Sequence, residues 1–282
     1  MTTPTRHRPR RLFGLVVTVV LGGCANESAW APSPPHYDWP DEFSYRIEYV
    51  AKAMRDTQVV SRYEEARSLR FVVRDDRYWV WNDSVSKGSS LAGARPQGDS
   101  VIPADTLHYY VRLTRLGEFA DVEPGCDPTV AACHDVPPSA LPMELRRVIP
   151  RLPVWWPPKG QEWVDTLRFD DLPLPDAARG LVVTTYRDQR DTVLAGRGYW
   201  RVAWKSVRRA WRLSGGTMVA DAAAEESGVV LVDKQRLVPA FAVWNGVVAA
   251  PPPLHAAGVT VTEFVGRAWL GGSPFDSRLV GR

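Results

Sequence analysis

Apolar and polar residues alternate near the start of the folded part of the chain. Phe43, Tyr45, Ile47 and Tyr49 are separated by single, mostly polar residues. A period of two is typical of a strand that buries one face and exposes the other. The pattern therefore predicts a strand, and the alternative is a helix that continues through Met54.

The next alternating segment predicts a β-hairpin. Every second residue of Leu69–Arg74 is apolar, Asp75 and Asp76 follow, and Tyr78–Trp81 is a second apolar segment. Two strand-like segments joined by a pair of turn-forming residues are typical of a hairpin. Residues 83–106 are rich in Ser, Gly and Pro, and we expect them to form a loop.

Strand patterns recur to the end of the chain, separated by turn-forming residues. Further strands are expected at Tyr109–Leu116, Glu118–Val122, Trp163–Phe169, Leu181–Tyr186, Thr192–Leu194, Gly198–Val207, Trp211–Leu213, Val229–Val232, Val238–Val248 and Val259–Leu270. This spacing predicts a mainly β domain at residues 43–282. Its core would be a curved antiparallel sheet that forms a half-barrel, a barrel or a sandwich, with one or two short helices.

One segment has the periodicity of a helix. Over Ser139–Ile149, apolar residues recur on a single helical face. Ser139 can accept hydrogen bonds from the free backbone N–H groups at the start, and Pro150 ends the helix. Ala220–Glu226 is a second, shorter candidate, for a helix or a polar turn.

The first residues have the layout of an export signal. A basic stretch with four Arg precedes the apolar run Leu12–Leu21. This run is about half of the roughly 20 residues that a membrane-spanning helix needs. A short apolar run behind a basic stretch is typical of a secretory signal peptide.

The run ends in Leu21-Gly22-Gly23-Cys24, which resembles the lipobox of bacterial lipoproteins. In that family the cysteine thiol receives a diacylglycerol, a peptidase cuts before the cysteine, and the new amino terminus is acylated. The resemblance covers residues 1–24. It implies a signal peptide at residues 1–23 and a membrane anchor of fatty acyl chains, such as palmitate, at Cys24. The alternative is an ordinary signal peptide with an incidental cysteine.

Residues 24–42 are expected to form a lipidated, Pro-rich tether. Pro-rich segments are stiff and extended and do not build a packed core. A Pro-rich ligand for the groove of a partner is the alternative. Ala25, rather than Asp, follows the cysteine, which resembles lipoproteins sorted to the outer membrane of Gram-negative bacteria. The expected location is therefore the outer membrane, facing the periplasm, provided that the organism has two membranes.

Cysteine content and charge limit the partners. Cys126 and Cys133 remain once Cys24 is assigned, and a close pair in an exported protein predicts a disulfide. A metal site that includes His134 is the alternative. Removal of the signal peptide takes away four Arg, so the formal net charge of +3 becomes −1. A near-neutral chain gives no electrostatic case for nucleic acid binding.

No catalytic, cofactor or metal-binding motif is recognisable. The sequence lacks a Gly-x-Ser-x-Gly nucleophile elbow, a phosphate-binding Gly-rich loop and a His-Glu-x-x-His zinc helix. Arg208 and Arg209 could contact phosphates, but two basic residues ahead of a strand are typical of a solvated turn. We therefore expect no catalytic residue, no metal and no cofactor.

Tryptophan is the compositional outlier, with 12 residues that all follow the signal peptide. Trp79 and Trp81 are spaced to share one face of a strand, as are Trp200 and Trp204. Such rings either fill the core of a large β domain or line a pocket for an apolar molecule or a sugar. These four residues are the candidate ligand-binding residues.

Signal peptide, lipobox, Pro-rich tether and curved sheet together resemble periplasmic lipoproteins of the lipoprotein-carrier type. The resemblance implies a half-barrel wrapped around helices, with a cavity for acyl chains, and carries over no individual residue. The expected protein is a membrane-anchored, non-enzymatic envelope lipoprotein that binds a hydrophobic ligand or an envelope partner. The alternatives are a structural lipoprotein whose Trp residues are core, and a hydrolase acting on envelope polymers.

Overall fold

The computed structural model describes residues 35–91, 97–102, 106–125, 140–155, 158, 160–172, 178–189, 191–214, 217–249 and 259–272. All of them belong to the second of two compact units, Pro34–Arg282. Cys24, Cys126 and Cys133 lie outside the described residues, as does the predicted signal peptide. The lipid anchor and the disulfide therefore stay predictions.

Strands dominate the described residues, so the predicted mainly β class is confirmed. The single helix described is α1 (Ala140–Leu145). The strands are β1 (Glu42–Arg55), β2 (Gln58–Arg74), β3 (Arg77–Leu91), β4 (Gln97–Ile102), β5 (Thr106–Leu113), β6 (Phe119–Pro124), β7 (Glu162–Leu172), β8 (Ala178–Asp188), β9 (Thr192–Leu194), β10 (Arg197–Ser214), β11 (Thr217–Asp233), β12 (Val238–Ala249) and β13 (Val261–Leu270).

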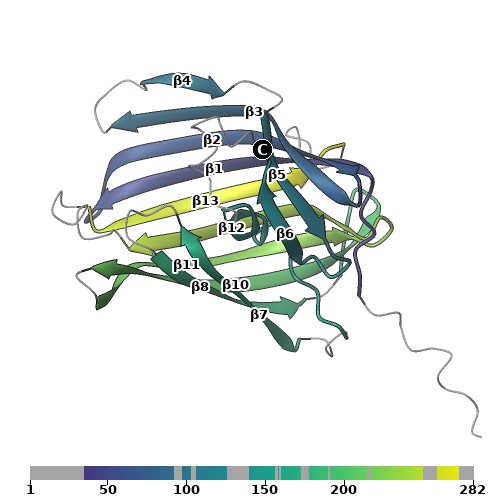
Figure 1. Ribbon diagram of the computed structural model, residues 1–282. Coiled ribbons are helices and arrows are strands. Elements are labelled where there is room, and N and C mark those ends of the chain that lie inside the picture. The colour runs from purple at the N-terminus through teal and green to yellow at the C-terminus, as the bar shows by residue number, and fades with distance from the viewer. Residues whose placement is uncertain are drawn as a thin grey trace, which may run out of the picture. The chain divides into compact units, whose positions relative to one another are not determined.

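All strands of the described residues belong to one sheet of 13 strands, and every pairing between them is antiparallel. The order is β6-β5-β3-β2-β1-β13-β12-β11-β10-β8-β7, with β4 beside β3 and β9 beside β10 (Figure 1). β6 and β7 end this order and do not pair with each other. Within the described residues the sheet is therefore open, not closed into a barrel. The central β1–β13 pairing joins the two ends of the folded unit.

One face of the sheet carries the main hydrophobic core. In β1, Phe43, Tyr45 and Ile47 are buried, and the residues between them are more exposed. The predicted strand is confirmed, and it continues through Met54 as a strand, not as a helix. Pairing with β2 and β13 on both sides satisfies the backbone of β1 and outweighs the helical preference of its Ala and Met residues.

The segment that contains α1 packs on this face. Leu141, Leu145, Val148 and Ile149 join the core cluster that the strands form. Ile149 N–H donates to the Leu145 carbonyl at 2.6 Å, so a tight turn continues beyond the helix. Pro150 follows and disfavours a helical conformation of the residue before it. The predicted helix is therefore real but shorter than expected. Within the described residues, no helix is long and apolar enough to cross a bilayer.

Contacts of α1 require the sheet to curve around it. Glu144 pairs with Arg67 on β2, and Arg146 pairs with Asp165 on β7. Seven inter-strand steps separate β2 from β7 in the strand order. They would put the two strands about 34 Å apart in a flat sheet. Two residues on one short segment cannot reach both, so the core-bearing face is concave.

The predicted hairpin at Leu69–Trp81 is confirmed as the turn between β2 and β3. Asp75 and Asp76 have φ values of 48° and 66°. A two-residue hairpin turn of this type needs positive φ at both positions, which Asp tolerates better than most residues.

Three other expectations differ from the structure. Residues 83–106 are not one loop, because β3 runs to Leu91 and β4 pairs with it. Ala220–Glu226 lies within β11 and pairs with β10, where backbone ladders override helix propensity. Tyr37, expected in the tether, is fully buried and donates from its hydroxyl to the Pro150 carbonyl at 2.8 Å. Packing against the core therefore begins before Phe43.

Candidate functional site

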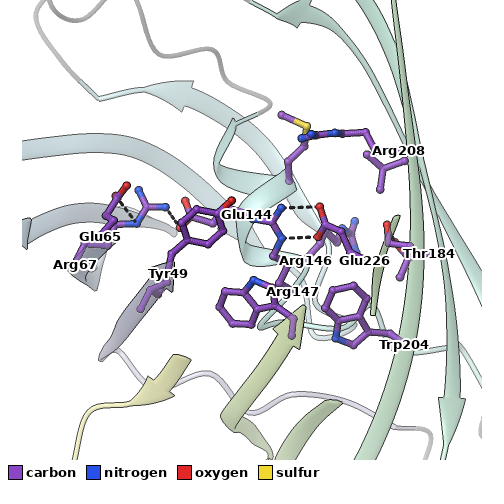
Figure 2. Close-up of a pocket in the computed structure, with 15 residues that line it drawn as sticks. Tyr49, Glu65, Arg67, Glu144, Arg146, Arg147, Thr184, Trp204, Arg208 and Glu226 are labelled. Atoms are coloured by element: carbon purple, nitrogen blue, oxygen red, sulfur yellow. Dashed lines mark hydrogen bonds and ion pairs between the residues drawn. The ribbon is translucent and has the colours of Figure 1, made fainter. Parts of the chain in front are cut away.

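A cavity of about 260 Å³ lies between the α1 segment and the concave face. The side chains around it come from β1, β2, β8, β10, β11 and β12 and from residues 143–147 (Figure 2). The apolar and aromatic residues of its lining are Ile47, Tyr49, Met143, Val182, Trp204 and Trp244. The charged residues are Glu65, Arg67, Glu144, Arg146, Arg147, Arg208 and Glu226. Thr184 and Ser206 complete the lining.

Two indole rings form what we call the aromatic floor, Trp204 and Trp244. Both are almost fully buried. Each faces a glycine on the neighbouring strand, Trp204 opposite Gly228 and Trp244 opposite Gly266. A Cβ atom on Gly228 would lie 2.8 Å from Cε2 of Trp204, and one on Gly266 would overlap the Trp244 ring. The absence of these side chains lets the rings lie against the neighbouring backbone.

Arg147 and Glu226 form a two-pronged ion pair at the cavity. The Arg147 Nε and Nη2 groups donate to Oε2 and Oε1 of Glu226 at 2.6 and 2.7 Å, as Figure 2 shows. Burial alone lowers the pKa of Arg147, but the hydrogen bonds and charge of Glu226 outweigh burial and raise it. The pair ties the end of α1 to β11.

Arg67 holds the two other carboxylates of the lining. It lies 3.7 Å from Glu65 on its own strand and also pairs with Glu144 of α1. Burial lowers the pKa of Arg67, and the charge of Glu65 opposes that change. This end of the cavity therefore has two carboxylates for one guanidinium.

Arg146 also lines the cavity, but it pairs with a carboxylate outside the lining. Its Nη1 lies 2.9 Å from Oδ2 of Asp165, and Arg151 Nη1 donates to Oδ1 of the same carboxylate at 2.8 Å. The Asp165 side chain is only 3% exposed. Two guanidinium groups on one buried carboxylate fix residues 146–151 against β7.

Arg208 differs from the three other arginines of the cavity. Within the described part of the chain it forms no ion pair, and no dashed line reaches it in Figure 2. Its Nε is buried without a hydrogen-bond partner, as are the Nε of Arg146 and the indole N–H groups of Trp204 and Trp244, but Arg146 has an ion-pair partner in Asp165. Burial lowers the pKa of Arg208, against the charge of Glu226, which raises it.

This arrangement is built for binding more than for acid–base chemistry. Each carboxylate of the lining, Glu65, Glu144 and Glu226, is already held by Arg67 or Arg147. N–H donors without a partner remain, and they can donate only to a ligand that supplies acceptor atoms. Among the described residues there is no group of three or more His, Cys, Asp or Glu that could hold a metal ion.

The four tryptophans singled out in the sequence lie on two different faces. Trp204 lines the cavity, and Trp200 packs against the same core. Trp79 and Trp81 share a face, as their spacing requires, but it is the face opposite to the buried Val80. On that face an arginine lies over a Trp ring: the Arg74 guanidinium is 4.4 Å from the Trp79 ring centre. The structure therefore brings one of the four to the cavity.

Sequence reasoning missed the charged lining and misplaced Arg208. Arg208 and Arg209 lie within β10, not in a turn, and their side chains point to opposite faces. A signal for the charged lining was present in the sequence. Glu65 and Arg67 stand at every second position before the buried Leu69 and so share its face of the strand. Arg208 is likewise in phase with Trp204. Charges at core positions of a strand are unusual enough to mark a site.

Comparisons with known proteins identify no family for this chain. No protein-family model matches the chain, and no curated protein matches it. A solved structure on lipid–protein interactions in lipovitellin is similar to 84% of this chain, with 9% sequence identity and a TM-score of 0.35. The similar region is 26% of the lipovitellin chain, so this chain corresponds to about a quarter of that protein.

Proposed function

We propose that this protein is a lipid-anchored envelope protein that binds one small amphipathic molecule in the cavity under α1. The observation that supports binding is the cavity itself, with the aromatic floor on one side and unpaired N–H donors beside it. Apolar walls with a few polar groups are the usual composition of small-molecule sites. A purely structural sheet would fill this space with side chains.

The size of the cavity limits the ligand. At about 260 Å³ it lies just below the ~300–1,000 Å³ of common ligand pockets. It therefore suits a small molecule, or one chain and the head of a larger lipid, but not a whole multi-chain lipid.

Binding without catalysis is the activity that the lining favours. A glycoside hydrolase needs two carboxyl groups facing a shared space, one of them free to give a proton. Here Glu226 is locked to Arg147, and Glu65 and Glu144 face Arg67. The hydrolase alternative therefore has no free acid in this cavity.

The membrane anchor is supported by the sequence of residues 1–24 alone. Acylation at Cys24 and at the new amino terminus would supply more than one chain, and a single chain gives only marginal binding. Tethering at a membrane would place the cavity where amphipathic molecules are concentrated.

The first test is native mass spectrometry after exposure to an envelope lipid extract. The full 282-residue chain is made in a membrane-free translation system, so that Cys24 carries no acyl group. We expect one bound mass per chain that is lost on extraction with organic solvent. Ser206→Leu, which fills the cavity, should remove the bound mass, whereas Ser227→Leu on the opposite face of the sheet should retain it. An unliganded mass, or equal binding by both variants, would contradict the proposal.

A further inference from the structure

Apart from the nitrogens of Arg146, whose guanidinium pairs with Asp165, three buried N–H groups of the cavity-lining side chains lack an acceptor. They are Nε1 of Trp204, Nε1 of Trp244 and Nε of Arg208. Buried donors without partners cost folding free energy, since their hydrogen bonds to water are lost on folding. All three are donors, so each could be satisfied only by an acceptor.

The charges around Arg208 leave that guanidinium uncompensated. Glu226 and Arg147 are the nearby ionised groups that act on it. Glu226 is held through both of its oxygens by Arg147, so the local balance is one positive charge. At the other end, Glu65 and Glu144 share Arg67. The cavity is therefore polarised, with its unpaired cation on β10 and its excess of carboxylate around Arg67, between β2 and α1.

Along the inner face of β10, the side chains become more polar toward Arg208. Trp204, Ser206 and Arg208 follow one another at every second position, so an indole, a hydroxyl and a guanidinium lie in a row. Four strand residues cover about 13 Å. The Ser206 hydroxyl is buried and accepts from the Thr184 hydroxyl at 3.2 Å, which leaves its own proton free for an acceptor.

We propose that Arg208 recognises an anionic group of the ligand, a carboxylate or a phosphate, while the apolar part lies on the aromatic floor. This inference rests on the proposed function and names the ligand class of the same cavity, a single-chain anionic amphiphile. A guanidinium matches the paired oxygens of carboxylate and phosphate. Burial strengthens the contact because water competes less.

The test separates the head group from the chain. Isothermal titration calorimetry on the full unacylated chain compares the affinities of six compounds. Four carry a decyl chain, namely decanoate, decyl phosphate, decanol and decylammonium, and are used below their micelle concentrations. Acetate and inorganic phosphate carry the anionic group alone. We expect decanoate and decyl phosphate to bind at least about tenfold more tightly than decanol, the range of one charged hydrogen-bond contact. Decylammonium should bind no better than decanol. Acetate and inorganic phosphate should bind at least about 100-fold more weakly than their decyl counterparts, because they bury no chain.

Two neighbouring variants assign the preference to one side chain. Arg208→Gln should abolish the roughly tenfold preference for decanoate over decanol, so that the two compounds bind with about equal affinity. Arg209→Gln is the matched control, since Arg209 is exposed on the opposite face of the same strand, and it should bind like the unmodified chain.

The outcomes distinguish the inference from the function on which it rests. Equal affinity for decanol and decanoate, or an unchanged preference in Arg208→Gln, would overturn the anion site and leave amphiphile binding standing. Binding of acetate or inorganic phosphate as tight as that of the decyl compounds would support an anion site and overturn the amphiphile function. No binding by any of the six compounds would overturn both.

Discussion

Chemically identical side chains in this cavity have opposite roles because their partners differ. Arg147 and Arg208 are both guanidinium groups of the lining. Arg147 has the whole carboxylate of Glu226, and its pKa is raised. Arg208 has no carboxylate partner among the described residues, and burial lowers its pKa. Arg147 therefore contributes to stability, whereas Arg208 costs stability in the unliganded protein.

Stability measurements on two substitutions test this difference. Arg147→Met leaves Glu226 buried without its partner, and breaking such a pair costs about 3–5 kcal/mol. Arg208→Met removes an unpaired buried charge, so we expect the free energy of unfolding to stay within about 1 kcal/mol or to rise. Urea unfolding followed by circular dichroism gives both values. Equal losses in the two variants would show that Arg208 has a stabilising partner.

Residue roles were only partly accessible from the sequence. Trp204, one of the four candidate tryptophans, lines the cavity, and its spacing from Trp200 places both on one face of a strand. Arg208 was assigned to a turn because it stands beside Arg209. Adjacent strand residues face opposite sides, so one member of such a pair can be buried and the other solvated.

At the scale of elements, glycines decide where the indoles of the floor can lie. Gly228 on β11 lies opposite Trp204, and Gly266 on β13 lies opposite Trp244. An isolated glycine in a strand pattern suggests a close approach of this kind, but the sequence does not identify the partner. The register of the paired strands identifies the Trp ring that each glycine faces.

Gly228→Ala tests the contribution of this register. The added Cβ would lie 2.6 Å from the Val243 carbonyl oxygen and 2.8 Å from the Trp204 ring, so we expect a loss of about 1–3 kcal/mol from overpacking. Tryptophan fluorescence should change as the floor moves. Gly198→Ala is the control, because its Cβ would meet only Lys234 Cδ at 3.6 Å. A strand alanine there should leave stability unchanged or slightly higher. Equal effects would remove the close-packing explanation.

At the scale of the whole chain, the proposed function depends on an anchor that only the sequence supports. Cys24→Ser should abolish labelling with radioactive palmitate, because the thiol is the acceptor of the diacylglycerol in the family that the lipobox resembles. The protein should then be unprocessed or soluble. Labelling that persists in this variant would refute the lipobox interpretation.

The Cys24→Ser variant also tests the predicted disulfide. Maleimide should label no thiol after unfolding without reductant if Cys126 and Cys133 form that bond.

Local patterns in the sequence determined the class of this protein. Alternation fixed most strands and the hairpin at Asp75 and Asp76, because side-chain period and turn chemistry are local properties. They also predicted the helix near residue 140, although not its length. Long strands through Ser-, Gly- and Ala-rich segments were missed, since backbone ladders to neighbours on both sides set them.

Only the tertiary structure decided that a cavity exists and what lines it. Pairing of β1 with β13 and the curvature around α1 bring Arg67, Arg147, Arg208 and Trp244 to one space from distant parts of the chain. No local pattern encodes that meeting, because it depends on strand order and register. The sequence by itself determined a β-rich domain and predicts an export signal before it, and the fold determined which of the charges in the cavity are left without a partner.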